Sequence, residues 1–152
     1  MSPTFNAKRH EPQWRIRIFM KKETVRIIEL PKIADPRGNL SFIQGGAALP
    51  FEIERCYWIY DVPGGEVRYG RALKTTSELI VALSGSFDVV IDGERYHLRR
   101  SYQGLLVPPM HWREIDNFST NSVAMVLAST TFSEDDYIRD YETYKRMKDE
   151  ER

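Results

Sequence analysis

The stretch GGEVRYGRALKTTSELIVALSG, residues 64–85, carries the most information about how this chain folds. It opens on two glycines, passes through a polar segment and continues into the apolar run ELIVAL (78–83), which ends at Ser84-Gly85. A short apolar run bounded by glycine-containing turns is typical of a β-strand. The stretch therefore predicts an apolar strand that the chain enters and leaves through turns.

Similar short runs recur on both sides of this stretch, separated by connections rich in Gly, Pro, Asp or Asn, as strand connections are. Asp92-Gly93 predicts a two-residue hairpin turn, and Phe87, Val89 and Ile91 alternate with their neighbours as in a half-buried strand. The runs are VRIIEL (25–30), LSFI (40–43), RCYWIY (55–60), ELIVAL (78–83), SFDVVI (86–91), RYHL (95–98), GLLV (104–107), HWREI (111–115) and SVAMVLA (122–128). So many short strands in one unit are expected to close into a barrel or a two-sheet jelly roll, which leaves few strand edges exposed.

Only the C-terminal region has the periodicity of a helix. Ser133 is a plausible N-cap, and the three acidic residues that follow it suit the positive end of a helix dipole. Tyrosine and isoleucine side chains between Tyr137 and Tyr144 recur on one helix face. The pattern predicts a helix over residues 133–147.

The first 22 residues differ in character from the rest of the chain. They are basic, they lack the apolar core of a secretory signal, and patterned sequence begins only near Val25. We therefore expect residues 1–22 to be a flexible extension. The alternative is that the run RIRIF (15–19) forms an extra strand. Residues 23–148 are expected to form one domain.

Composition excludes several classes of protein. The chain has 152 residues, with 22 Lys and Arg against 22 Asp and Glu, and this balance argues against a protein that binds nucleic acid or a membrane surface. No window approaches the roughly 18 apolar residues of a membrane-spanning helix. The single cysteine, Cys56, rules out an internal disulfide and fits a cytoplasmic protein. We expect Cys56 to be buried in its strand.

The spacing of residues 64–85 is similar to the first motif of the cupins, which are small jelly-roll barrels. In metal-binding cupins, two histidines and a glutamate of this motif hold a metal ion together with a histidine of a second motif. The corresponding positions here are Arg71, Leu73, Glu78 and Arg113. Arginine keeps its proton and leucine has no lone pair, so no metal is expected. The two arginines could instead bind a phosphate or carboxylate, or they could face solvent or pair with Glu78 and Glu114.

Longer segments resemble the WxcM-like sugar 3,4-ketoisomerases, small cupins that act on thymidine-diphosphate 4-keto-6-deoxyglucose. The resemblance covers about residues 25–145. It rests on DPRGNLSFI (35–43), IERCYWIYDVPGGEVRYG (53–70), KTTSELIVALSGSFDVVIDG (74–93), LLVPPMHWREIDNFS (105–119), VAMVLAS (123–129) and DYIRDYE (136–142). It implies an all-β, cupin-type antiparallel jelly-roll barrel over residues 25–130 with a short C-terminal helix.

The resemblance also implies an activity and a partner. The family moves a keto group from C4 to C3 of the hexose through an enediol, which requires a group that removes one proton and a group that delivers another. No metal and no organic cofactor is implied. The expected partners are a nucleotide-diphosphate sugar of the thymidine type and a second copy of the chain, in a homodimer that exchanges N-terminal strands.

The chain departs from the family where the proton carriers are expected. In the family two histidines flank an alanine, and the corresponding residues here are Arg71 and Leu73, beside the matching residues Arg68, Ala72 and Lys74. Histidine exchanges protons near pH 7, whereas arginine and leucine do not. Tyr57, Glu78 and His111 are the candidates to replace the histidines; His97 and His10 are interpreted as structural.

The resulting hypothesis assigns Tyr57, Arg71 and Glu78 to catalysis. Five further residues would bind the substrate at the same barrel mouth, and these are Arg37, Arg68, Lys74, Trp112 and Arg113. The first function considered is an isomerase for a nucleotide-activated deoxysugar in glycan or lipopolysaccharide biosynthesis. The alternatives are a catalytically silent binder or partner subunit, and a different activity in which Arg71 holds an anionic group.

Overall fold

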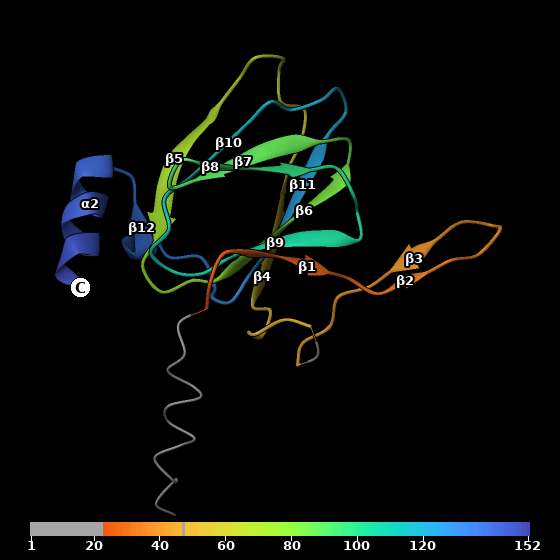
Figure 1. Ribbon diagram of the computed structural model, residues 1–152, viewed down its shortest axis with the longest axis horizontal. Helices are drawn as coiled ribbons and strands as arrows, with labels where there is room; N and C mark the ends of the chain where they lie inside the picture. The colour runs from red at the N-terminus through yellow and green to blue at the C-terminus, as the bar shows by residue number, and fades with distance from the viewer. Residues whose placement is uncertain (1–22, 47) are drawn as a thin grey trace, which may run out of the picture.

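A computed structural model describes residues 23–46 and 48–152 of this chain as two antiparallel β-sheets and a C-terminal helix. The extension expected over residues 1–22, its alternative strand RIRIF and His10 lie outside the described residues. None of the helices in the described part of the chain has the length and apolar character needed to cross a bilayer. The expected class, an all-β antiparallel barrel with a C-terminal helix, is confirmed (Figure 1).

The two larger sheets contain five strands each. In order across the first sheet, these are β1 (Arg26–Glu29), β9 (Gln103–Val107), β6 (Glu78–Ser84), β11 (Val123–Ala128) and β4 (Arg55–Ile59). The second sheet consists of β12 (Tyr137–Ile138), β5 (Arg68–Leu73), β10 (Arg113–Asp116), β7 (Phe87–Ile91) and β8 (Glu94–Leu98). Every pairing is antiparallel.

The core lies between the two sheets, where the inward-facing residues of each alternating strand meet. Phe87 and Val89 of β7 are fully buried there and pack with Leu105 and Val126 of the opposite sheet. The Asp92-Gly93 hairpin that follows β7 is confirmed, since both residues have the positive φ angles that this turn requires, 49° and 83°. Period-two patterning and turn chemistry thus predicted this part of the barrel correctly.

The strand ELIVAL is buried on both faces because a second layer covers the outside of the first sheet. Residues 48–53, together with Ile43, cover that face, and Leu49 packs against Leu79 and Val81, which point away from the barrel interior. Gly104 of the neighbouring strand is in contact with Leu79, since a Cβ at that position would lie 2.7 Å from the leucine side chain. The glycine permits the close packing of β6 against β9.

A short hairpin projects from the barrel. It is formed by β2 (Lys32–Ile33) and β3 (Leu40–Ser41), and it extends away from both sheets (Figure 1). Ile33 and Leu40 of this hairpin are each 55% exposed. We call residues 32–41 the arm. Its apolar side chains are uncovered by the described part of the chain.

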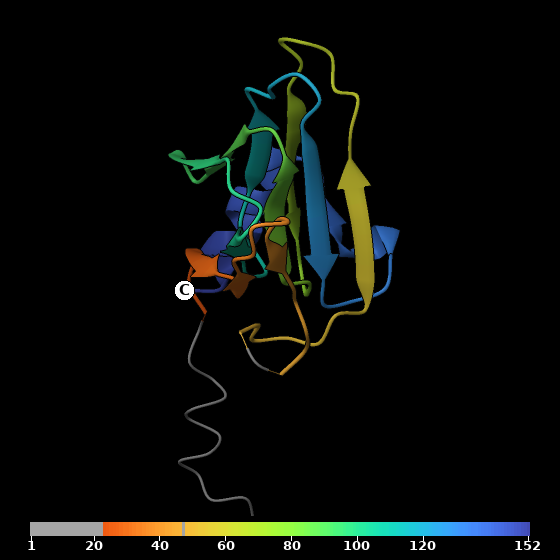
Figure 2. The ribbon, with the colours of Figure 1, turned by 90° about the vertical axis from the view of Figure 1, so that its right-hand side faces the viewer.

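The C-terminal region contains three short elements where one helix over residues 133–147 was predicted. Glu134–Asp136 is a single 3₁₀ turn, β12 is a strand, and the helix α2 spans Tyr141–Glu150 (Figure 1). In Figure 2, which views the molecule from the side opposite α2, the dark-blue helix lies behind the sheets. The cap is Asp140, whose carboxylate accepts a hydrogen bond from the Thr143 backbone N–H at 2.9 Å. The prediction of a helix from Ser133 was wrong because Tyr137 and Ile138 pair with β5, and the long-range ladder outweighs the local helical pattern.

Cys56 is exposed, and the prediction that it would be buried was also wrong. β4 is the edge strand of the first sheet, and its outward face is not covered by the layer that covers β6. Trp58 and Tyr60, which share that outward face with Cys56, are 59% and 60% exposed. An apolar sequence therefore did not imply burial at this edge.

Candidate active site

The candidate site lies in the seam between the two sheets, where the edge strand β4 approaches β5. Tyr57 is on the inner face of β4, two residues before the buried Ile59. Arg71 is on the facing side of β5, and its Nη2 donates a hydrogen bond to the Tyr57 hydroxyl at 2.8 Å. This contact joins the sheets at a point where no backbone ladder connects them.

Glu78, the first residue of β6, continues the network into the barrel. The carboxylate is fully buried and accepts a hydrogen bond from the Tyr57 hydroxyl at 2.5 Å. Its second oxygen accepts from Arg113 of β10, which is also buried and whose backbone pairs with that of Arg71. A buried carboxylate needs such donors because desolvation opposes its charge. The four side chains form one continuous polar chain, Arg71–Tyr57–Glu78–Arg113, in an otherwise apolar core.

The charges around Tyr57 favour its protonated form. Burial, and after it the negative charge of Glu78, raises the pKa of the Tyr57 hydroxyl above its usual value near 10, although the nearby Arg71 acts in the opposite direction. Burial acts to lower the pKa of Arg71, but the hydrogen bond to the Tyr57 oxygen and the negative charge of Glu78 outweigh it, so this pKa is also raised. At neutral pH the site therefore presents a phenol that holds its proton between a carboxylate and a guanidinium.

Leu73 lies on β5 two residues after Arg71 and is fully buried. Its backbone pairs with Tyr137 of β12, so it closes the end of the barrel with an apolar side chain. Among residues 23–46 and 48–152, no group of His, Cys, Asp and Glu side chains could hold a metal ion. The polar groups available for chemistry here are a phenol, a carboxylate and guanidinium groups.

Three of the residues expected at the same mouth are exposed. Arg68 begins β5, and Lys74 follows its last residue, where it lines a cavity of about 460 Å³ together with Ser77. Arg37 lies in the turn of the arm, where its side chain is 90% exposed and forms an ion pair with Asp35 at 2.9 Å. Arg37 is therefore separated from the Tyr57 network within one chain (Figure 1).

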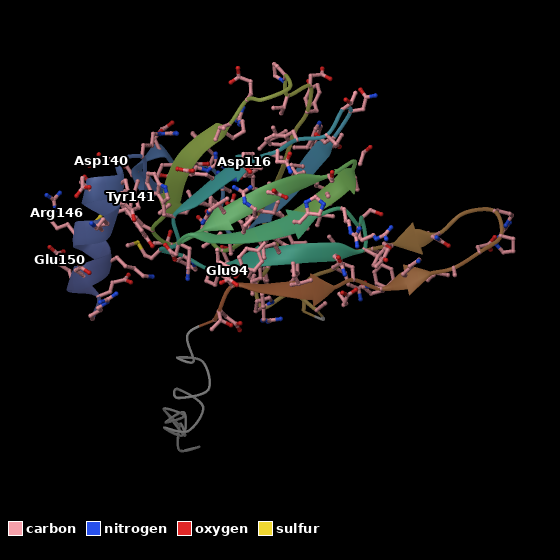
Figure 3. All side chains as sticks on the ribbon, turned by 45° about the horizontal axis from the view of Figure 1, so that its top comes forward. Glu94, Asp116, Asp140, Tyr141, Arg146 and Glu150 are labelled. Atoms are coloured by element: carbon pink, nitrogen blue, oxygen red, sulfur yellow. The ribbon has the colours of Figure 1, made fainter. Side chains whose placement is uncertain are left out.

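Trp112 lies on the outer face of the second sheet, not at the barrel mouth. Its ring is 5.3 Å from that of Tyr141 and 5.7 Å from that of Tyr144, both on α2, and Tyr141 is on the side of the helix that faces the barrel (Figure 3). A Cβ at Gly70 would lie 2.2 Å from the Trp112 Nε1, so the glycine makes room for the indole. The structure thus brings together Tyr57, Arg71, Glu78 and Arg113, but not Trp112.

The imidazole of His111 also lies apart from the network, although the backbone carbonyl of His111 accepts a hydrogen bond from Arg113 Nη2 at 3.3 Å. Its Nδ1–H is shared between the carbonyl oxygens of Pro108 and Pro109, at 3.1 and 3.0 Å. The ring lines a separate cavity of about 420 Å³ that includes Asp92 and Lys148. Burial, and after it the charge of Lys148, lowers the pKa of His111. Among the described residues, no side-chain contact connects His111 with Tyr57.

Sequence reasoning missed three side chains beside the network. The guanidinium carbon of Arg55 lies 5.6 Å from the centre of the Tyr57 ring and 5.7 Å from that of Phe132. Tyr137 lies on the other side, with its ring 5.7 Å from the guanidinium carbon of Arg71. Period-two alternation in RCYWIY places Arg55 on the face of Tyr57 and could have identified it. Tyr137 carried no such signal, because its segment was interpreted as helical, and Phe132 lies just before that segment, outside the predicted strands.

Comparison with known proteins identifies similar sequences. A family model described as "FdtA: WxcM-like, C-terminal" matches residues 23–149. The TDP-4-oxo-6-deoxy-α-D-glucose-3,4-oxoisomerase of Aneurinibacillus thermoaerophilus is 38% identical over 125 residues, which are 80% of this chain and 90% of that enzyme. The similarity therefore includes both sheets and most of α2.

Solved structures agree with the sequence match. QdtA, a sugar 3,4-ketoisomerase from Thermoanaerobacterium thermosaccharolyticum in complex with TDP, has a TM-score of 0.81 at 32% identity and covers 84% of this chain and 96% of its own. A single-residue variant of QdtA in complex with TDP-4-keto-6-deoxyglucose has a TM-score of 0.76 at 34% identity, with 81% and 92% of the two chains covered. The likeness extends over nearly the whole of those proteins.

Proposed function

Because this chain belongs to the WxcM-like family of sugar 3,4-ketoisomerases, we propose that it moves the keto group of a thymidine-diphosphate 4-keto-6-deoxyhexose from C4 to C3. The observation that carries the proposal is the 38% identity with the Aneurinibacillus isomerase, which extends over 90% of that enzyme. The polar chain inside the barrel supports it, since it contains groups that can exchange protons. The single cysteine is compatible with a reducing cytoplasm, where we place the protein.

The reaction is balanced without an external oxidant. A base removes the proton from C3, and the electron pair of that C–H bond forms the C3–C4 double bond while the C4 carbonyl oxygen becomes negative. A proton then passes between the oxygens on C3 and C4, and an acid delivers a proton to C4. The product has a ketone at C3 and a hydroxyl at C4, so the step is an isomerisation.

We assign the proton transfers to Tyr57 and Glu78. Across the hydrogen bond of 2.5 Å, the Glu78 carboxylate accepts the phenol proton, and the phenolate then removes the proton from C3. When Tyr57 later delivers a proton to C4, the protonated Glu78 returns its proton to the phenolate, so both groups end in their starting state. Arg113 is bonded to the other carboxylate oxygen and keeps Glu78 in place. Arg71 holds the Tyr57 hydroxyl and can donate to the oxygen that becomes negative.

Substrate binding is proposed for the exposed cations of β5. Arg68 precedes Arg71 on β5, Lys74 follows the last residue of that strand, and both can neutralise the diphosphate. Arg37 could contribute only in an assembly of two chains, in which the arm of one reaches the other. We therefore include a homodimer in the proposal, supported by the exposed apolar residues of the arm. Trp112 has a supporting role, in which it packs β5 against α2.

The test follows the ring protons of the substrate. The protein is incubated with TDP-4-keto-6-deoxyglucose in deuterated water, and NMR should show loss of the C3 proton signal and formation of the 3-keto product. Turnover at about 1–10³ per second would be typical of an enzyme. Binding of the keto sugar without exchange or product would contradict the proposal.

One observation favours a silent binder as the second candidate. Arg71 and Leu73 stand where the family resemblance places two histidines, and a lost acid–base group costs on the order of 10²–10⁴-fold in rate. If the chain binds without turnover, the double change Arg71→His with Leu73→His should raise isomerisation by at least about 10²-fold. No gain from the double change, with the fold retained, would exclude that explanation.

A further inference from the structure

Five side chains, one of which is Tyr57 itself, contact one another in a closed ring of side chains beside the Tyr57 hydroxyl. The guanidinium groups of Arg55 and Arg71 both contact the aromatic ring of Tyr57. Arg71 also lies over the aromatic ring of Tyr137. The rings of Tyr137 and Phe132 are 5.7 Å apart, and Phe132 returns to Arg55. The two guanidinium groups therefore lie in the seam between the sheets, with the aromatic ring of Tyr57 between them on one side and the rings of Phe132 and Tyr137 on the other.

Both guanidinium groups have buried N–H groups that bind nothing in the described residues. They are Nε and Nη1 of Arg55 and Nε of Arg71. A guanidinium that stacks on aromatic rings uses its faces and leaves the N–H groups in its plane free to donate. Buried donors without a partner are destabilising, and in native proteins they commonly bind a water, an ion or a ligand. Arg113 also has a buried Nε of this kind, but its guanidinium is already paired with Glu78.

The charges of the ring require an anion. Arg113 and Glu78 neutralise each other inside the barrel. Arg71 is hydrogen-bonded to the Tyr57 hydroxyl, which is uncharged because it holds its proton. Arg55 forms no ion pair with a carboxylate in the described part of the chain. Two positive charges thus remain beside Tyr57 in a partly buried site, where an oxyanion would gain more than it would in water.

We propose that Arg55 and Arg71 form a two-guanidinium site for the enediolate, in which each donates to one of the neighbouring oxygens on C3 and C4. This inference rests on the proposed function. Both oxygens carry negative charge in turn, because the proton passes between them before C4 is protonated. The enediolate is preferred over the diphosphate as occupant, since Arg71 also contacts the hydroxyl of Tyr57, so the anion lies where the proton is transferred. Arg55 is then a catalytic residue.

The test compares Arg55→Gln with Arg26→Gln, which removes the same charge from an exposed arginine of β1. A donor to a developing oxyanion typically contributes 10²–10³-fold to kcat, so Arg55→Gln should lower kcat by about that factor with little change in KM. Its affinity for TDP should equal that of the unchanged protein. Arg55→Lys keeps the charge and should recover part of the loss, and circular dichroism checks the fold of each variant.

Two other results would overturn the inference. If Arg55→Gln weakens TDP binding and raises KM at constant kcat, Arg55 binds the diphosphate; if it changes neither constant, the residue has no role in the reaction. Oxalate, a planar dianion with neighbouring oxygens, tests the site without turnover. Oxalate binding that is lost in Arg55→Gln but kept in Arg26→Gln would support the anion site even in a protein that does not isomerise the sugar, whereas equal binding by all variants would exclude it.

Discussion

At the scale of single residues, Tyr57 has the central position in the site. Its hydroxyl contacts both the buried carboxylate of Glu78 and the guanidinium of Arg71. Its raised pKa keeps the proton on the phenol until a neighbouring group changes charge. Chemistry at Tyr57 is thus coupled to Glu78, and neither side chain can be altered without affecting the other.

Tyr57→Phe removes this hydroxyl and leaves the ring that Arg55 and Arg71 stack on. We expect isomerisation to fall by about 10²–10⁴-fold, because a positioned acid–base group is lost. Tyr60→Phe is the control, since Tyr60 directly follows the same strand and is 60% exposed. Rates measured by NMR should separate the two variants; equal rates would exclude Tyr57 as the proton carrier.

Arg113 is expected to matter for stability. Arg113→Met would leave Glu78 buried without its cationic partner, and breaking one half of a buried ion pair typically costs about 3–5 kcal/mol. Arg139→Gln breaks an exposed pair with Glu134 and should cost no more than about 1 kcal/mol. Urea unfolding measures both values. A loss in Arg113→Met no larger than that in Arg139→Gln would contradict the importance of the buried pair for stability.

At the scale of secondary-structure elements, the decisive contact is between β12 and β5. The carboxylate of Asp136 accepts from the backbone N–H and the hydroxyl of Thr75, both at 2.8 Å, and from the Thr76 hydroxyl. These bonds hold the chain after β5 against the residue that precedes β12. They thereby position Tyr137 beside Arg71, and the ring of side chains depends on them.

Asp136→Asn should loosen β12 and destabilise the protein by roughly 1–3 kcal/mol at neutral pH. Burial alone would raise the pKa of Asp136, but the hydrogen bonds from Thr76 and Thr75 outweigh it and lower that pKa. A lowered carboxyl pKa contributes stability above its ordinary value of 3.8, and this contribution is lost as the pH falls through the lowered value. The deficit of the variant should therefore shrink in acid.

Asp135→Asn is the matched control, since Asp135 is exposed in the same 3₁₀ turn. It should leave both the unfolding free energy and its pH dependence nearly unchanged. Chemical denaturation between pH 7 and pH 3 compares the two variants. A deficit of Asp136→Asn that stays constant over this range would show that charge at Asp136 does not contribute.

At the scale of the whole molecule, two of the surfaces with exposed apolar side chains in the described residues are the arm and the outward face of β4. The arm exposes Ile33 and Leu40, and the outward face of β4 exposes Trp58 and Tyr60. An edge strand and a projecting hairpin are surfaces that commonly pair with another chain. Since the arm also contains Arg37, an assembly through it would bring a cation of one chain towards the other.

We therefore expect a dimer at micromolar concentration. The double change Ile33→Lys with Leu40→Lys places charge on the arm, and it should convert the dimer to a monomer because burying those side chains would become unfavourable. Sedimentation equilibrium measures the mass, and circular dichroism checks that the barrel is retained. A monomer of the unchanged protein, or a dimer that survives the double change, would exclude the arm as the interface.

The sequence by itself determined the local features of this protein. Alternation in residues 86–91 and the hairpin at Asp92-Gly93 depend on neighbouring residues only, since side-chain direction and φ are set within a few positions. The grouping of Arg71, Glu78 and Arg113 was also readable, because motif spacing reflects how strands pair. These predictions needed no knowledge of the packing between layers.

Only the tertiary structure decided which faces are covered and which side chains meet across the seam. Cys56 is exposed because β4 is an edge strand, and Tyr137 is in a strand because β5 offers a partner there. Arg55 meets Phe132 although some 75 residues separate them in the sequence. Burial and long-range contact depend on the arrangement of whole sheets, and no local pattern contains that arrangement.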